Sequence, residues 1–247
     1  MGTGTALALA LLIAGALVAV HLAAPRMRRI PGVPERVVAS AAGGIAVSYV
    51  FLHLLPELVE GNESIGRLLE DRVDPTPLLD LAIFTVALAG FAAFYGLERL
   101  ARRAGDESPG IFRLHLGAFA VYNALITYTM PLRLRTGAGF AVLFSVAMAL
   151  HFVLTDRGLS RHYPRRFARS GRAVLAGALV LGWAAAAVAA PTRTEVVAFL
   201  TALLGGSILL NVFKEELPEG AGSSYPWFLG GLAVYGALLA VVTSMAG

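Results

Sequence analysis

About eight apolar runs, each close to the length needed to cross a lipid bilayer, dominate the sequence. A membrane-spanning helix needs roughly 20 mainly apolar residues. Of the 247 residues, 57% are hydrophobic and 15% are charged, whereas a soluble protein carries about 25% charged residues. The sequence therefore predicts an all-α, polytopic membrane protein and excludes an ordinary soluble enzyme. The expected spans cover approximately residues 4–24, 37–59, 78–98, 112–132, 137–156, 173–190, 195–216 and 227–246.

The connections between these runs are short and rich in proline, glycine and charge. None is long enough for a second folded unit, so we expect one membrane domain over residues 1–247. It would consist of three helices at about 1–98, a central pair at about 112–156, and three more helices at about 173–246. The first run has no basic residues before it and no small-residue cleavage pattern after it, so we expect it to be retained.

The basic residues predict how the chain is oriented. Of the 20 Lys and Arg residues, 15 fall in alternate connections and five in the others. Short connections rich in Lys and Arg stay on the cytoplasmic side. Both termini are therefore expected outside, in the cell's inner (plasma) membrane. The arginine clusters then serve as topology signals that contact anionic lipid, and we expect no nucleic-acid partner despite the net charge of +4.

An internal repeat relates residues 43–57 to residues 205–219, at an offset of 162. Seven of the fifteen aligned positions are identical, and they include a Gly-Gly pair, a Val-Phe pair and a Leu-Pro-Glu triplet. Two simpler explanations stay open. Gly-Gly allows helices to pack closely, and Leu-Pro-Glu can end a helix at the membrane surface.

The two repeated segments fall in the second and seventh expected spans, which cross the membrane in opposite directions. Two halves of opposite orientation are typical of transporters, because they can exchange conformations to open a central path to either side. We therefore expect a 3+2+3 inverted repeat, in which two triplets of helices enclose the central pair.

Imidazole and carboxylate groups lie at both ends of this expected path, and such donors suit a divalent cation. His53 and Glu57 would lie on one helix face at the outer end. The candidate ligands at the inner end are Glu215, Glu216 and Glu219. The alternative is that these groups only meet water at the membrane surface.

The segments His53-Leu54-Leu55-Pro56-Glu57 and Glu215-Glu216-Leu217-Pro218-Glu219 resemble the ZIP (Zrt/Irt-like) family of divalent-metal transporters. The expected topology and repeat are similar too. The resemblance implies uptake of zinc, iron or manganese toward the cytoplasm by a homodimer, through an elevator-like movement of the central helices. The metal ion would be a substrate, and no resident cofactor is expected.

The central helices depart from that family, whose metal motifs there pair histidine with glutamate or aspartate. Here Tyr122-Asn123 stands in the fourth helix, and His151 with Thr155 in the fifth, without the acids. The candidate residues along the path are Asn123, His151, Tyr122, Thr155 and Asn211, with His151 also a candidate metal ligand. Alternatively, Asn123 and His151 only hydrogen-bond to each other.

Two hypotheses follow from these patterns. The first is a ZIP-like transporter of a divalent cation with a depleted central site. The second is a transport-inactive homologue that works as a membrane sensor, scaffold or partner subunit.

Metalloprotease, nucleophile-elbow and phosphate-loop motifs are absent from the sequence, so we do not expect an enzyme. We further expect Asp156 to pair with its neighbour Arg157, and His21 to lie at the membrane surface.

Overall fold

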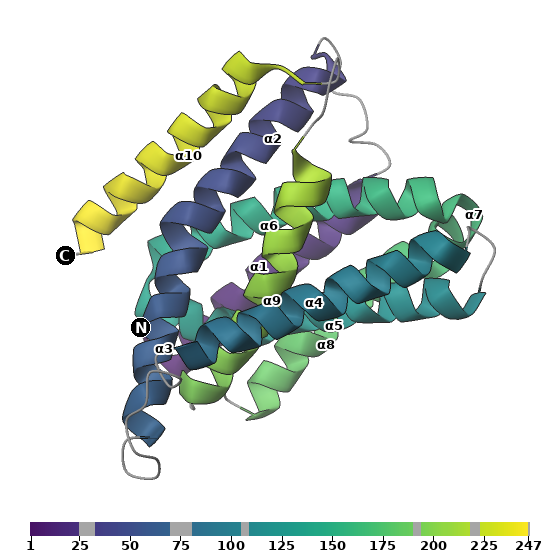
Figure 1. Cartoon of the computed structure of the whole chain (residues 1–247). Coiled ribbons are helices and arrows are strands. Elements are labelled where there is room, and N and C mark those ends of the chain that lie inside the picture. Colours follow the sequence, from purple (N-terminus) through teal and green to yellow (C-terminus); the bar gives the residue numbers. More distant parts are fainter. Residues whose placement is uncertain (25–32, 70–80, 105–108, 190–193, 218–222, 247) are drawn as a thin grey trace.

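The computed structural model describes residues 1–24, 33–69, 81–104, 109–189, 194–217 and 223–246, and over these residues the chain forms helices and no strand (Figure 1). Seven of the described helices are long and apolar enough to cross a membrane, and an eighth apolar helix, Ala198–Lys214, is shorter. This is the architecture of a multi-pass membrane protein. It confirms the all-α prediction.

The bounds of the helices follow the apolar runs, with differences at their ends. In chain order they are α1 (Thr3–Ala23), α2 (Glu35–Tyr49), η1 (Val50–Leu54), α3 (Leu55–Leu69), α4 (Ala82–Ala104), α5 (Pro109–Thr136), α6 (Ala138–His162), α7 (Pro164–Arg166), η3 (Phe167–Gly171), α8 (Arg172–Ala189), α9 (Thr194–Asn211), η4 (Val212–Glu216) and α10 (Tyr225–Ala246). The elements labelled η are short π-helical turns.

The second span continues as a helix past the point where Leu-Pro-Glu could have ended it. Pro56 has no N–H group, and in a regular α-helix its ring would clash with the carbonyl four residues earlier. The π-helical turn η1 directly precedes it, and the Leu55 N–H donates to Val50 O instead of to a carbonyl four residues back. This wider turn lets α3 continue to Leu69.

The second copy of Leu-Pro-Glu ends its helix. Leu217 has extended backbone angles directly after η4, as expected for a residue that precedes a proline. The fourth span is also longer than expected, because α5 runs to Thr136 and includes Arg133. The expected connection at 157–172 is largely helical, with α6 extending to His162 and α7, η3 and α8 following.

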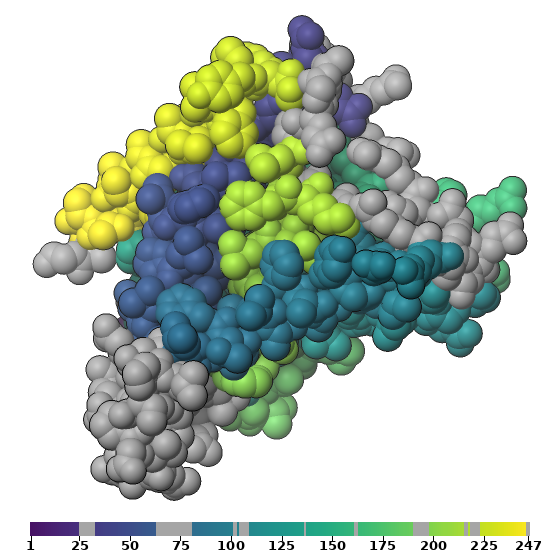
Figure 2. All heavy atoms as spheres, in the orientation of Figure 1, coloured from purple at the N-terminus to yellow at the C-terminus, as the bar shows by residue number. Residues whose placement is uncertain are grey.

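The helices pack as two groups, which we call the first and second bundles (Figure 1). The first bundle contains α1, α5, α6 and α8, with α8 packed against both α1 and α5. The second bundle contains α2 with η1 and α3, α4, α9 with η4, and α10. Its closest pairs are α2 with α10 and α4 with α9. In the space-filling view α4 lies across the front, beside α9 and the α2 helix (Figure 2).

Glycines set the close approach of helices inside the second bundle. A side chain at Gly44 would run into the Phe228 carbonyl of α10, and one at Gly206 into the Ala87 carbonyl of α4. From the opposite helices, Gly231 and Gly90 meet the backbones of α2 and α9 in the same way. Small residues let helix backbones touch in a membrane, where lipid leaves little hydrophobic drive for association.

In the first bundle too, helix backbones approach closely at a glycine, and hydrogen bonds between the helices add to the contact. Gly182 of α8 packs on the Ala124 carbonyl of α5. Thr127 donates its hydroxyl to Leu179 O at 2.8 Å, and the Trp183 indole donates to Leu7 O at 3.0 Å. Backbone contacts of this kind tie α1, α5 and α8 into one unit.

Candidate functional site

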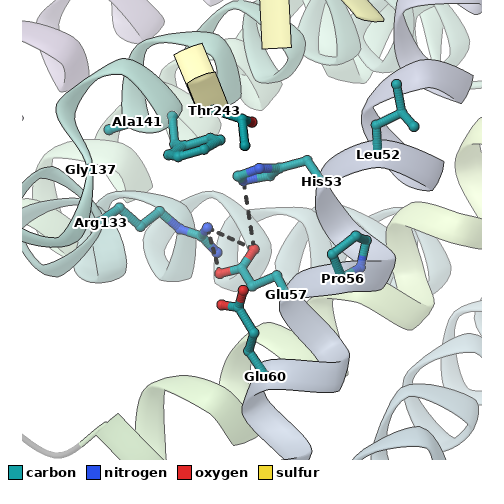
Figure 3. A pocket seen from close by; sticks show the side chains of 10 residues that line it. Leu52, His53, Pro56, Glu57, Glu60, Arg133, Gly137, Ala141 and Thr243 are labelled. Carbon is teal, nitrogen blue, oxygen red and sulfur yellow. Dashed lines mark hydrogen bonds and ion pairs between the residues drawn. The ribbon is translucent and has the colours of Figure 1, made fainter. Parts of the chain in front are cut away.

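A cavity of about 370 Å³ lies where the two bundles meet (Figure 3). The helix formed by η1 and α3 supplies His53, Glu57 and Glu60 to its wall, and the end of α5 supplies Arg133. The lining is completed by Leu52 and Pro56 of the same helix, by Gly137, Phe140 and Ala141 at the start of α6, and by Thr243 of α10. The site is therefore a polar cluster within an otherwise apolar interface between helices.

Glu57 and Arg133 form an ion pair across this cavity. The Arg133 Nη1 atom lies 2.7 Å from Glu57 Oε1 and 2.9 Å from Oε2, so that one N–H group faces both carboxylate oxygens. Arg133 also lies over the Phe144 ring at 4.3 Å and donates from Nη2 to the Thr201 hydroxyl at 3.4 Å. Both side chains of the pair are largely buried, at 11% and 26% exposure, so screening by water is reduced.

His53 lies one helical turn before Glu57 and points into the same cavity (Figure 3). Its Nε2 atom is 3.9 Å from Glu57 Oε2, and it is buried without a hydrogen-bond partner. The ring stacks on Phe140 of α6 and lies beside the Tyr49 ring. The hydroxyl of Tyr49 is likewise buried without a partner. Such atoms are uncommon in protein interiors and often mark functional positions.

A second polar cluster lies wholly inside the first bundle and joins α1, α5 and α6. His21 Nδ1 is 3.0 Å from Asp156 Oδ1, and Asn123 Nδ2 is 2.9 Å from His21 Nε2. All three side chains are at most 2% exposed. His21 also stacks on Phe152, with ring centroids 4.5 Å apart.

The hydrogen bonds of this cluster fix its donors and acceptors. An amide NH₂ group can only donate, and Asn123 donates to both His21 Nε2 and Leu175 O. His21 Nε2 therefore accepts, and Nδ1–H donates to Asp156. The other carboxylate oxygen, Oδ2, is buried without a hydrogen-bond partner. Ionisable groups at membrane depth are costly, which makes them functional candidates by default.

The remaining path candidates of the central helices lie next to this cluster. His151 is 3% exposed, with its ring beside that of Tyr122, and Thr155 Oγ1 is 3.3 Å from His151 Nε2. The Tyr122 hydroxyl donates to the Met148 sulfur. Asn123 bonds to His21 rather than to His151, so the alternative in which Asn123 and His151 only hydrogen-bond to each other is wrong.

The candidates of the seventh span are only partly described. Asn211 is buried at the end of α9, and its Nδ2 atom has no hydrogen-bond partner. The side chains of Glu215 and Glu216, and the whole of Glu219, lie outside the described residues. The inner ligand set of the sequence analysis therefore stays a prediction.

A second ion pair joins the bundles at the far end of α6. Arg157 Nη1 lies 3.6 Å from Glu35 Oε1 at the start of α2. The expected local pair between Asp156 and Arg157 is therefore wrong. Neighbouring residues on a helix point in different directions, so Asp156 faces α1 while Arg157 faces α2.

Sequence reasoning missed three important residues: His21, Asp156 and Arg133. His21 is the only ionisable residue of its apolar run, residues 4–24, and that isolation is the signal that could have identified it. Arg133 lies one residue beyond the expected span at 112–132, so the apolar pattern alone places it in a connection. Its partner, Glu57, is 76 residues away in sequence.

Among the described residues, no group of three His, Asp or Glu side chains converges closely enough to hold a metal ion. The cavity brings together imidazole and carboxylate, but a guanidinium already faces the Glu57 carboxylate. No protein-family model, curated protein or solved structure matches the chain. Function is therefore inferred from this geometry together with the sequence repeat and motifs.

Proposed function

We propose that the chain is a membrane transporter that carries a divalent metal cation by alternating access. Two inverted copies of a three-helix unit would supply the symmetry, and the first bundle would move against the second. The metal class is zinc, iron or manganese, as the ZIP-like motifs imply. Orientation with both termini outside and assembly as a homodimer are parts of the same proposal.

One observation carries the proposal: two helix pairs pack in the same register. Gly44 and its repeat counterpart Gly206 are 162 residues apart, and each packs on a backbone carbonyl of a neighbouring helix. Those carbonyls belong to Phe228 and Ala87, which are 141 residues apart. Gly231 and Gly90, which pack back from the same neighbours, are also 141 residues apart.

The π-helical turns support the same relation. The turns η1 (Val50–Leu54) and η4 (Val212–Glu216) lie at equivalent positions of the repeat. Phe51 and Phe213, which are also counterparts, contact each other edge to face with ring centroids 6.3 Å apart. Residues related by a twofold axis meet in this way only beside the axis, which would pass between these rings.

The two copies run in opposite directions. Gly205 of α9 lies beside Leu54 and Leu58, whereas Ala198, earlier in α9, lies beside Gly61, later in α3. Antiparallel copies related by a twofold axis are the arrangement expected of an inverted repeat, which supports alternating access. Buried polar atoms of Tyr49, His53 and Asn211 have no hydrogen-bond partner, and on this proposal they would be available to an ion on its path.

The test is uptake of Mn²⁺ into vesicles that contain the purified chain, with and without a cross-link between the bundles. The natural sequence has no cysteine, so introduced pairs react without background. A Cβ atom at Gly139 would lie 3.6 Å from Val242 Cβ, within the range of a disulfide. In the Gly139→Cys/Val242→Cys variant we expect uptake under reducing conditions and its loss on oxidation.

The matched control is a cross-link inside one bundle. A Cβ atom at Gly61 would lie 3.3 Å from Ala198 Cβ, both in the second bundle. Oxidation of the Gly61→Cys/Ala198→Cys variant should leave uptake intact. Mn²⁺ prefers oxygen and nitrogen donors over thiols, so the introduced cysteines interfere little. Equal uptake by the oxidised and reduced inter-bundle variant would contradict movement between bundles.

A transport-inactive membrane scaffold or sensor is the second candidate, and the Glu57–Arg133 pair favours it. A carboxylate that is neutralised by an arginine of the same chain is not available to a metal ion as it stands. This candidate predicts no uptake of Zn²⁺, Fe²⁺ or Mn²⁺ by the natural chain in the same vesicles.

A further inference from the structure

We infer that Glu57 is an exchange point, where a divalent cation bound with His53 replaces the guanidinium of Arg133 and thereby lets the two bundles separate. This inference rests on the proposed function and assigns a role to an ion pair that a simple metal-ligand account leaves unexplained. The inference is supported by the contacts of Arg133, which are made partly to its own bundle and partly to the other bundle.

Arg133 belongs to the first bundle, and two of its contacts cross to the second. Its guanidinium contacts Glu57 of α3 and Thr201 of α9, both in the second bundle. The ring beneath it, Phe144 of α6, belongs to its own bundle. Movement of the first bundle would therefore break the contacts to Glu57 and Thr201, while Arg133 could travel with Phe144 still beneath it.

Separation of the bundles would leave the Glu57 carboxylate in the cavity without its cation. Removing one partner of a largely buried ion pair is unfavourable, because the remaining charge is poorly solvated. The same carboxylate would be neutralised again if another cation took the place of the guanidinium. A bound cation would thus lower the free energy of the separated state more than that of the closed state, which is the requirement for coupling.

His53 makes a divalent metal the appropriate cation. Zinc is held by imidazole and carboxylate at about 2.0–2.2 Å, which places two ligands of one ion about 3.4 Å apart. His53 Nε2 and Glu57 Oε2 are 3.9 Å apart on successive turns of one helix face, so a small side-chain rotation brings both to one ion. Monovalent alkali ions have no comparable preference for imidazole nitrogen.

The Arg133 guanidinium and the metal compete for one carboxylate, so the natural chain should bind metal weakly. Titration of the purified, tag-free chain in detergent with Zn²⁺ alone measures this competition. We expect Arg133→Gln to lower the dissociation constant about tenfold or more, which is the effect of removing a competing contact of modest strength. Glu57→Gln, alone or combined with Arg133→Gln, should abolish this binding.

Two further variants control for charge and for folding. Arg135→Gln removes a positive charge two residues away on an exposed part of the same helix, and should bind Zn²⁺ like the natural chain. Arg133→Lys keeps a cation without the guanidinium fork, and should fall between the natural chain and Arg133→Gln. An Arg133→Gln effect no larger than that of Arg135→Gln, or Zn²⁺ binding retained in Glu57→Gln, would overturn the exchange at Glu57.

The movement itself is measured as the distance between spin labels on cysteines introduced at Val142 and Leu238, exposed positions on α6 and α10. In the labelled chain that keeps Arg133, Zn²⁺ should shift the distribution of distances between the two labels. In the labelled Arg133→Gln chain, the distribution should be shifted in the same direction without metal. No shift in either case would contradict the coupling.

The Zn²⁺ titrations and the distance measurements do not require transport. If Mn²⁺ uptake is absent but the predicted changes in Zn²⁺ affinity are found, the transporter proposal is refuted and the exchange site is retained.

Discussion

Contacts inside each bundle differ in kind from contacts between the bundles. Inside a bundle, helix backbones touch at glycines such as Gly182 and Gly44. Between the bundles, side chains make the contact on at least one side: the atoms nearest to a Cβ at Gly139 of α6 belong to the Val242 side chain of α10, and His53 stacks on Phe140. Backbone contacts cannot slide without separating the helices, whereas side chains can exchange partners. If the chain works as proposed, the surface between the bundles is therefore where movement is expected.

The polar residues follow the same division. His21, Asn123 and Asp156 are enclosed within one bundle, where each hydrogen bond joins helices that stay together. Glu57 and Arg133 come from different bundles and border a cavity. Buried networks with fixed partners specify a structure, whereas an ion pair beside a cavity can be replaced by other ions. This division can be tested through the free energy of unfolding, measured by titration with dodecyl sulfate.

The largest expected effect is at the buried cluster. His21→Ala would leave the Asp156 carboxylate buried without its remaining hydrogen-bond donor, and should lower the free energy of unfolding by about 3–5 kcal/mol. The double variant His21→Leu/Asp156→Leu removes both partners, and should recover much of this loss. Equal losses in the single and double variants would mean that the cluster is held by packing alone.

A smaller effect separates the two kinds of glycine. A methyl group at Gly182 would meet the Ala124 carbonyl and the Thr127 hydroxyl, so Gly182→Ala should destabilise the first bundle by about 1–3 kcal/mol. For Gly139→Ala the nearest atoms belong to the Val242 side chain, which can change rotamer, so this substitution should cost clearly less. If Gly139→Ala lowered the free energy of unfolding more than Gly182→Ala, the helices of different bundles would be packed as closely as the helices inside one bundle.

The sequence predicted the spans well and the polar partners poorly, for a physical reason. Insertion into lipid is decided locally by runs of apolar residues, so the fold class could be inferred without knowing any contact. The pairing of His21 with Asp156 joins residues 135 positions apart, and it depends on how α1 packs against α6. No local pattern encodes that packing.

The two Leu-Pro-Glu copies illustrate the same limit. Both contain a proline, which normally interrupts a helix. One helix nevertheless continues through η1 into α3, whereas the other ends before Leu217. His53 and Glu57 could be inferred as site residues because they lie on one helix face. Arg133, which faces the Glu57 carboxylate, could not be inferred, because its helix ends beyond the apolar run.

A hydrogen bond between the bundles gives the third effect. The Tyr235 hydroxyl of α10 donates to Leu143 O of α6 at 3.0 Å and is buried. Tyr235→Phe should lower the free energy of unfolding by about 0.6 kcal/mol, the average for interhelical hydrogen bonds in membranes. It should also broaden the inter-bundle distance distribution of the Val142 and Leu238 labels. Tyr225→Phe, at an exposed position of the same helix, is the control. If Tyr235→Phe lowered the free energy of unfolding by several kcal/mol, this contact between the bundles would be as strong as the contacts inside them.

The smallest effect is expected at the ion pair on the far end of α6. Arg157 and Glu35 are 3.6 Å apart, and the Glu35 side chain is 64% exposed, so water and salt screen the attraction. Glu35→Gln should change the free energy of unfolding by less than about 0.5 kcal/mol, and the change should vanish in high salt. Arg133→Gln, by contrast, removes a buried contact beside the cavity, and its effect should persist in salt. Because both pairs join the same two bundles, a persistent effect at Glu35 would mean that both ends of the interface are held equally. Movement would then have to break both ion pairs together, and exchange of a cation at Glu57 alone could not release the first bundle.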